Sequence, residues 1–263
     1  MSNPSAFSRL HIHYHTGSLP PPYSHEITAE ITARPTGYGI SFAINYLDRD
    51  DLTEDDLYME GFTPDDGFAW EGALPDVWVN YLQQSLDVST FPRDQQEAAQ
   101  AEPIITLKYQ SDASEKQVAG IVAENGYWEY LLQELMQSIY ELAGLERPLE
   151  VVYREVSKQD PPLEVALNAS FAAREAQVKI SREESAPIEK TIPWKEIKEG
   201  MKRIYQYEFD EQRAKPKVPM KRGSYLYLGE GGWLPIPQGL LPAQGNTQPR
   251  AEHIQEWFRQ FAD

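Results

Sequence analysis

Hydrophobic and polar residues alternate along three segments near the start of the chain. Leu10, Ile12 and Tyr14 alternate with histidines, and the same period of two runs through residues 26–33 and 40–46. An apolar residue at every second position indicates strands of an antiparallel sheet that bury one face. We therefore expect the chain to begin with three half-buried strands.

The spacing of apolar residues becomes helical after Pro75. A short strand is expected at residues 68–72, behind the turn-forming pair Asp66-Gly67, and Pro75 then suits the first turn of a helix. The apolar stripe of this expected helix consists of Val77, Trp78, Tyr81, Leu82 and Leu86.

The middle of the chain predicts a connection between larger elements. Residues 88–102 have the composition of a linker, and residues 104–109 predict one strand. The run 114–144 predicts a helix that is interrupted near Asn125-Gly126. We therefore expect this part of the chain to link two units.

The opening pattern returns from residue 149. Alternating apolar residues predict strands at residues 149–153, 163–171 and 176–180, and Pro193 then precedes a helical stripe that begins with Trp194. The first ninety residues have the same order of strands, Pro-rich turn and Pro-initiated helix with a tryptophan. We interpret this order as a diverged internal duplication; the alternative is that two antiparallel meanders are alike by chance.

Together these patterns predict an α+β fold of two related antiparallel-sheet-plus-helix units, with a C-terminal hairpin and amphipathic helix. The hairpin is expected to turn across residues 229–232. The expected divisions are a first sheet-and-helix unit (1–90), a linker, strand and helical connection (91–147), a second sheet-and-helix unit (148–212), and a basic loop, hairpin and C-terminal helix (213–263).

The formal charge of −17 is distributed unevenly. Residues 1–100 hold 16 acidic and 4 basic side chains, whereas residues 191–222 hold 9 basic and 5 acidic ones. Because an acidic protein repels a phosphate backbone at long range, nonspecific binding of nucleic acid is disfavoured. The contrast favours oriented docking onto a charged protein partner or self-association with a second copy.

The composition also bears on the compartment. The chain has no cysteine, which excludes disulfides and thiolate metal sites and fits a reducing environment. No segment reaches the roughly 20 apolar residues that span a bilayer, and the first residues lack the pattern of a signal peptide. We expect a soluble, cytoplasmic protein with no membrane contact.

Four of the five histidines lie within residues 11–26. On a strand, His11, His13 and His15 share one face, with neighbours roughly 6.6 Å apart and the outer pair roughly 13 Å apart. Two of these imidazoles and Glu26 of the next strand could bind a divalent metal ion, so His11, His13 and Glu26 are the candidate metal ligands. A solvated face with cross-strand His–Glu pairs is the simpler alternative, and a pH-responsive contact is a third. No other cofactor is predicted.

A cluster of basic residues precedes and enters the C-terminal hairpin. Basic side chains interleaved with aromatic ones could contact the phosphates and stack the bases of single-stranded nucleic acid. Lysines in a proline-containing loop are also commonly only solvated. The candidate nucleic-acid-binding residues are Lys215, Lys217, Lys221, Arg222, Tyr225, Tyr227 and Trp233.

The expected C-terminal helix carries an apolar stripe of Ile254, Trp257, Phe258 and Phe261. Such a stripe is too apolar to be left in water. It is expected to dock either onto the chain's own sheets, as terminal helices commonly do, or onto another protein, in which case these four are the partner-binding residues.

Recognisable catalytic motifs are missing. The chain has no Gly-x-Ser-x-Gly and no His-Glu-x-x-His, and the acidic stretch from Asp48 lacks the glycine and the final glutamate of a calcium loop. No catalytic residue is assigned. The leading hypothesis is a nonenzymatic binding or adaptor protein acting through protein–protein contacts; the alternatives are single-stranded nucleic-acid binding and a metal-dependent enzyme centred on the first strand.

Overall fold

The chain forms two compact units, residues 1–146 and 147–263. The expected connection at 91–147 is therefore part of the first unit, and the C-terminal segment from residue 213 is part of the second. The computed structural model describes residues 7–100, 102–111, 116–183, 185–242 and 251–262.

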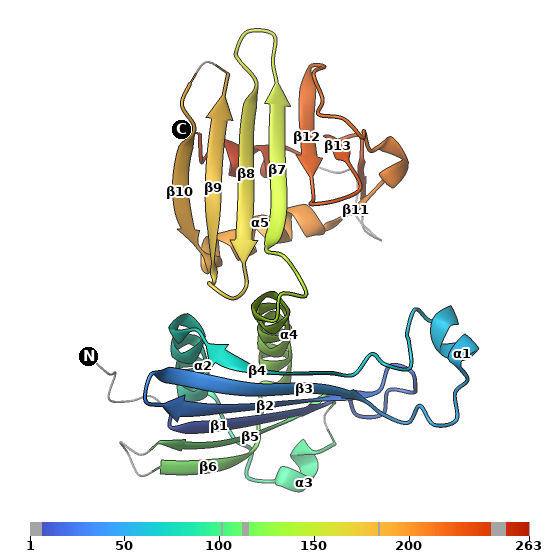
Figure 1. The fold of residues 1–263 in the computed structure, drawn as a ribbon, viewed down its shortest axis with the longest axis vertical. Coiled ribbons are helices and arrows are strands. Elements are labelled where there is room, and N and C mark those ends of the chain that lie inside the picture. Colours follow the sequence, from blue (N-terminus) through green and yellow to red (C-terminus); the bar gives the residue numbers. More distant parts are fainter. Residues whose placement is uncertain (1–6, 101, 112–115, 184, 243–250, 263) are drawn as a thin grey trace. The chain divides into compact units, whose positions relative to one another are not determined.

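The first unit is built on an antiparallel sheet of six strands, counted over the described residues, in the order β4-β3-β2-β1-β5-β6 (Figure 1). A four-stranded meander comes first in the chain, and a hairpin that follows much later adds β5 beside β1. The strands are β1 (Arg9–His15), β2 (His25–Arg34), β3 (Gly37–Tyr46), β4 (Phe68–Leu74), β5 (Ile104–Ser111) and β6 (Lys116–Ile121).

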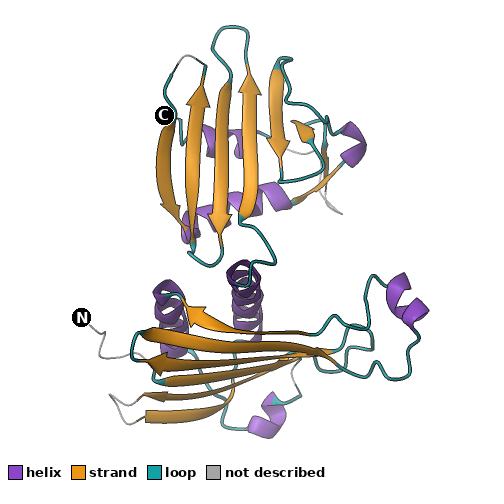
Figure 2. Ribbon diagram, in the orientation of Figure 1, coloured by secondary structure: helices purple, strands orange, loops and turns teal. Residues whose placement is uncertain are grey.

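One face of this sheet is covered by α2 (Asp76–Val88) and α4 (Asn125–Leu142), as Figure 2 shows. The alternating residues Leu10 and Ile12 are fully buried against them, as are Trp78 of α2 and Trp128 of α4. The strand period and the helix stripe therefore meet in one apolar core. Two short helices, α1 (Glu54–Met59) and α3 (Gln95–Ala98), lie in the connections.

Two expectations for the first unit were wrong. Residues 116–121 form β6, which pairs with β5, where the start of a helix was expected. Asp66-Gly67 does not close a tight hairpin, because residues 47–67 lie between β3 and β4 and contain α1. In both places pairing with a neighbouring strand decides the structure, and the local spacing of apolar residues does not report that pairing.

The second unit repeats this plan in a sheet whose order is β10-β9-β8-β7-β12-β13 over the described residues. A meander again comes first, and a late hairpin adds β12 beside β7. Its elements are β7 (Leu149–Val156), β8 (Leu163–Ser170), β9 (Glu175–Arg182), β10 (Ile188–Pro193), α5 (Trp194–Tyr205), β11 (Tyr207–Phe209), η1 (Glu211–Arg213), β12 (Gly223–Tyr227), β13 (Trp233–Ile236), β14 (Leu240–Pro242) and α6 (Glu252–Arg259).

The two sheets have the same strand order when β7 takes the place of β1, β12 that of β5 and β13 that of β6. Pro75 and Pro193 directly precede the helices α2 and α5 that follow the two meanders. The α+β fold with two related sheet units is confirmed, and the shared order is consistent with the duplication.

The C-terminal hairpin and helix are also present. The strands β12 and β13 pair across the expected glycine-rich turn, and α6 packs on the same face of the second sheet as α5. The strand β10 was missed, as was β14, which lies between the hairpin and α6 and pairs with β11. Residues 243–250 lie outside the described residues. Among the described residues, the helices are too short or too polar to cross a bilayer.

Candidate functional site

The face of the first sheet turned away from α2 and α4 carries a row of polar side chains. Strand alternation sends Leu10, Ile12 and Tyr14 into the core, so the residues between them point outward. We call this side the outer face of the first sheet. On β1 it carries Arg9, His11, His13 and His15.

Histidines and glutamates pair across β1 and β2 as the strand pattern predicts. His13 Nε2 lies 3.0 Å from Glu26 Oε2, and His11 Nε2 lies 4.0 Å from Glu30 Oε1. The hydrogen bond with His13 is the largest cause that lowers the pKa of Glu26, and Asn45 adds a second hydrogen bond. These contacts match the solvated-face interpretation of the histidines.

The candidate metal ligands are only partly brought together. His13 and Glu26 are in contact, while His11 lies beside Glu30 instead. His15 Nδ1 accepts a hydrogen bond from the backbone N–H of Gly17. Within the described ranges no group of three or more histidine and carboxylate side chains is arranged to hold a metal ion.

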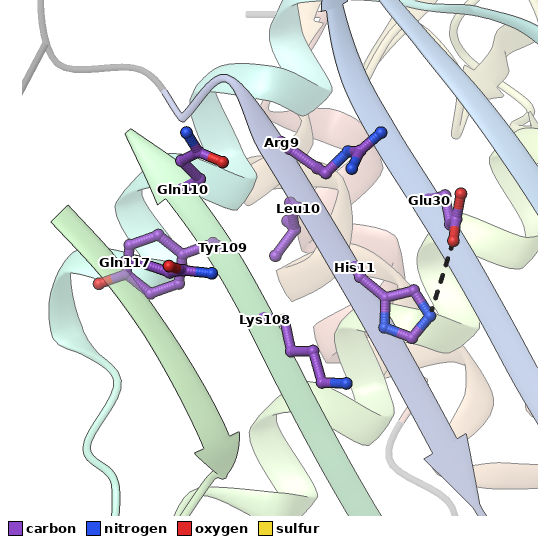
Figure 3. A pocket seen from close by; sticks show the side chains of 8 residues that line it. All are labelled: Arg9, Leu10, His11, Glu30, Lys108, Tyr109, Gln110 and Gln117. Carbon is purple, nitrogen blue, oxygen red and sulfur yellow. Dashed lines mark ion pairs between the residues drawn. The ribbon is translucent and has the colours of Figure 1, made fainter. Parts of the chain in front are cut away.

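A pocket of about 400 Å³ opens on the outer face around His11 (Figure 3). Its side chains come from four neighbouring strands, β2, β1, β5 and β6. The register sets Arg9 opposite Gln110 and His11 opposite Lys108, and so assembles the pocket from residues about a hundred positions apart. The lining residues are Arg9, Leu10, His11, Glu30, Lys108, Tyr109, Gln110 and Gln117.

The polar groups of this pocket are incompletely paired. His11 Nδ1 is buried and has no hydrogen-bond partner within the described structure. Burial lowers the pKa of His11, Lys108 and His13 lower it further, and Glu30 opposes them. The folded state therefore favours the neutral imidazole. Neither Arg9 nor Lys108 forms an ion pair with any residue that the structure describes.

The sequence placed His11 on this face but missed Lys108 and Gln117. Strand β5 was expected as an isolated strand and β6 as part of a helix, so neither was placed beside β1. The alternation of Ile105 and Leu107 with Thr106 and Lys108 was a signal that could have put Lys108 on the polar side.

A second candidate surface is the acidic excursion, which we define as residues 47–67 between β3 and β4. It contains nine acidic residues and a single basic one, Arg49. The Arg49 guanidinium stacks on Tyr46 and Phe62, at 3.8 and 4.7 Å from the ring centroids. It also donates hydrogen bonds to the carbonyl oxygens of Pro22 and Thr63 and pairs with Asp66.

The acidic excursion has internal hydrogen bonds and exposed apolar side chains. Thr53 and Asp56 form a capping box at α1, as their spacing in the sequence allows. Met59 is 85% exposed and Tyr58 is 56% exposed. Tyr23, 44% exposed on the adjoining loop, donates a hydrogen bond to Glu60.

Some of the candidate nucleic-acid-binding residues have exposed basic side chains, and others have buried aromatic rings. Lys217, Lys221 and Arg222 are exposed. Tyr225 and Trp233, in contrast, are only 3% and 8% exposed, and they pack with Val152 in a small cluster on the second sheet. Lys215 lies over the Tyr225 ring, and Tyr227 is half-buried beside Trp233. Tyr225 and Trp233 therefore offer no open ring face for base stacking.

The candidate partner-binding stripe on α6 is buried in the second unit's own core. Ile254 and Phe258 are fully buried, and Trp257 and Phe261 are no more than 9% exposed. Phe258 stacks on Tyr153 with ring centroids 4.9 Å apart. A Cβ at Gly200 of α5 would lie 2.0 Å from the Trp257 ring, so only glycine leaves room for this packing. The stripe docks within its own chain, which is the first of the two expected alternatives.

Comparison of the chain with protein-family models, with curated proteins and with solved structures finds no match.

Proposed function

We propose that this chain is a nonenzymatic binding protein whose acidic excursion docks a protein partner bearing basic and apolar side chains. The observation that carries the proposal is the combination, on one ordered loop, of nine acidic residues with the exposed side chains of Tyr58 and Met59. Aromatic and methionine side chains are enriched in interface cores, and complementary charge orients the encounter.

The internal role of Arg49 supports this proposal. Its side chain is 12% exposed, and its donors are used by Thr63 and Asp66 of the loop and by Pro22 beside it, so it does little to offset the surrounding negative charge. A loop already held by these contacts loses little conformational freedom when a partner binds. The excursion therefore presents a prearranged negative surface that also carries exposed apolar side chains.

The other hypotheses have weaker support. A nucleic-acid site on the second unit would rest on Lys217, Lys221 and Arg222 alone, since Tyr225 and Trp233 are buried. A metal-dependent enzyme would need a third ligand beside His13 and Glu26. The proposal of a binding protein does not depend on either.

The test uses a synthetic peptide of alternating lysine and leucine as a basic, apolar probe, with a glutamate–leucine peptide as its counterpart. Amide NMR signals of the full chain should shift in residues 47–67 when the lysine peptide is added, and the shifts should shrink as salt is raised. Met59→Asp should weaken binding about ten-fold or more, which corresponds to about 1.4 kcal/mol for loss of a central apolar contact.

Val88→Asp is the matched control, because Val88 is an apolar residue of the same unit that is 69% exposed and lies outside the excursion. The proposal is wrong if Met59→Asp and Val88→Asp bind the lysine peptide equally, or if the glutamate peptide binds as well. Light scattering of the wild type should show a monomer; a dimer that Met59→Asp dissociates would identify a second copy as the occupant.

A further inference from the structure

We propose that the pocket around His11 binds a small polar organic anion, namely a phosphate or carboxylate compound that also carries hydroxyl groups. The pocket lies on the outer face of the first sheet and uses none of the residues of the acidic excursion. The inference is therefore independent of the proposed protein docking.

The first argument is the placement of positive charge. The first unit contains 24 acidic and only 6 basic residues, a formal charge of −18, yet two of those six line this one pocket. Arg9 and Lys108 come from adjacent strands and have no ion-pair partner among the described residues. The two side chains point toward different ends of the pocket (Figure 3), so a ligand that spans it would form a charge-assisted hydrogen bond with each. The arginine fork suits either phosphate or carboxylate.

The second argument is the unpaired nitrogen of His11. A buried polar atom without a hydrogen bond carries a desolvation cost, so native proteins seldom leave one unsatisfied. His11 Nδ1 is such an atom. In the tautomer that carries its proton on Nε2, toward the Glu30 carboxylate, Nδ1 is an acceptor to which a hydroxyl group of the ligand would donate.

The third argument is the size and lining of the pocket. Its volume of about 400 Å³ lies within the range of small-molecule sites, about 300–1,000 Å³. Glu30 and the amide of Gln117 add an acceptor and further donors along the wall (Figure 3). Charged and amide groups of this kind favour a hydroxylated anion over an apolar ligand.

The experiment follows the imidazole signals of His11, assigned with a His11→Gln variant, in the full chain at pH 7.5 and constant ionic strength. Ribose 5-phosphate, gluconate and inorganic phosphate are the probes. At least one hydroxylated anion should shift the His11 signals saturably at millimolar concentration and bind about ten-fold more tightly than inorganic phosphate. Binding of ribose 5-phosphate alone would identify phosphate as the recognised group, and binding of gluconate alone would identify carboxylate.

Lys108→Gln and Arg9→Gln should each weaken this binding about ten-fold or more, because each removes one charge-assisted hydrogen bond. Arg93→Gln removes the same charge from an exposed position of the same unit outside the pocket, and should leave binding unchanged. The side chains of Arg9 and Lys108 are exposed, so these variants are expected to fold. The inference is overturned if no probe binds, if inorganic phosphate binds as tightly as the hydroxylated probes, or if all three variants bind alike.

Discussion

The outer faces of the two sheets differ in chemistry at the strands that correspond in the two strand orders, β1 and β5 in the first unit and β7 and β12 in the second. In the first unit, His11 of β1 lies opposite Lys108 of β5. In the second, Val152 of β7 lies opposite Tyr227 of β12. One pair lines an open polar pocket, and the other belongs to an apolar cluster.

The loop before β12 accounts for part of this difference. Arg154 of β7 donates a hydrogen bond to the carbonyl oxygen of Pro219, which is buried, and Tyr225 donates one to the carbonyl oxygen of Lys221. The second sheet thus has apolar contacts on both faces. The comparison teaches that two sheets of the same strand order can carry different chemistry at their outward positions.

The units also differ in charge, at −18 for residues 1–146 and +1 for residues 147–263. Part of the contrast lies in the connection after the third strand of each meander. The first unit has the acidic excursion of residues 47–67 there, while β9 and β10 are joined across residues 183–187. The proposed docking surface is therefore a feature that the second unit does not share.

The largest effect is expected from a substitution that destabilises the second unit and leaves the stability of the first unchanged. Phe258→Ala removes a fully buried ring that stacks on Tyr153, and should lower the free energy of unfolding of residues 147–263 by about 3–5 kcal/mol. Amide hydrogen exchange in the full chain should show the loss of protection in that unit alone. Equal loss in residues 1–146 would mean that the units unfold together; Val88→Ala, at an exposed position, is the control.

An intermediate effect is expected from Arg49→Gln, which removes a feature that only the first unit has. Loss of the stacked guanidinium and its hydrogen bonds should lower the free energy of local opening of residues 47–67 by about 1–3 kcal/mol. Hydrogen exchange should accelerate in the excursion and stay unchanged in β1 and β2. If exchange accelerates evenly over the first sheet, Arg49 stabilises the whole unit and not the loop.

The smallest effect concerns pH and sharpens the contrast between His11 and Val152. Because burial lowers the pKa of His11 below the ordinary value of 6.5, the folded state favours the neutral ring. The stabilisation is present above pH 6.5 and is lost as pH falls through the lowered pKa. His11→Gln should reduce the loss of stability that the first unit shows as pH falls, and it should leave the stability of the second unit unchanged.

Urea unfolding in phosphate-free buffers between pH 7.5 and 5, with hydrogen exchange to separate the units, measures that difference. The groups that face His11 are Glu30 on β2, Lys108 on β5 and His13 on β1. An opposite slope, with wild type gaining stability on acidification relative to His11→Gln, would show that Glu30 outweighs burial and Lys108.

How far the sequence predicts the molecule depends on how local each signal is. The alternation around Ile12 predicts both the strand and the outward direction of its histidines, because strand geometry alone fixes that parity. The strand β10 was missed because Lys190 stands on the row between Ile188 and Ile192 and breaks the apolar alternation. The stripe of α6 is plain in the sequence, but whether it docks on its own sheet depends on the space that Gly200 leaves for Trp257.

The pocket could not be predicted for a similar reason. Arg9 and Lys108 are remote in sequence, and only the pairing of β1 with β5 makes them neighbours. The sequence around each residue gives no signal of that pairing, because a single basic residue on a strand is commonly only solvated.

The late addition of β5 beside β1 also has a consequence in time during synthesis of the chain on the ribosome. β1 lies at one edge of the meander and has no partner on that side until residues 104–111 have emerged. At about 5–20 residues per second, this happens roughly 5–20 s after β1 itself has emerged. During this interval β1 could pair with a strand of another nascent chain, because an open edge is a template for aggregation. The outward Arg9 and the histidines of β1 make that edge polar on one side, and so discourage such pairing until its own partner arrives.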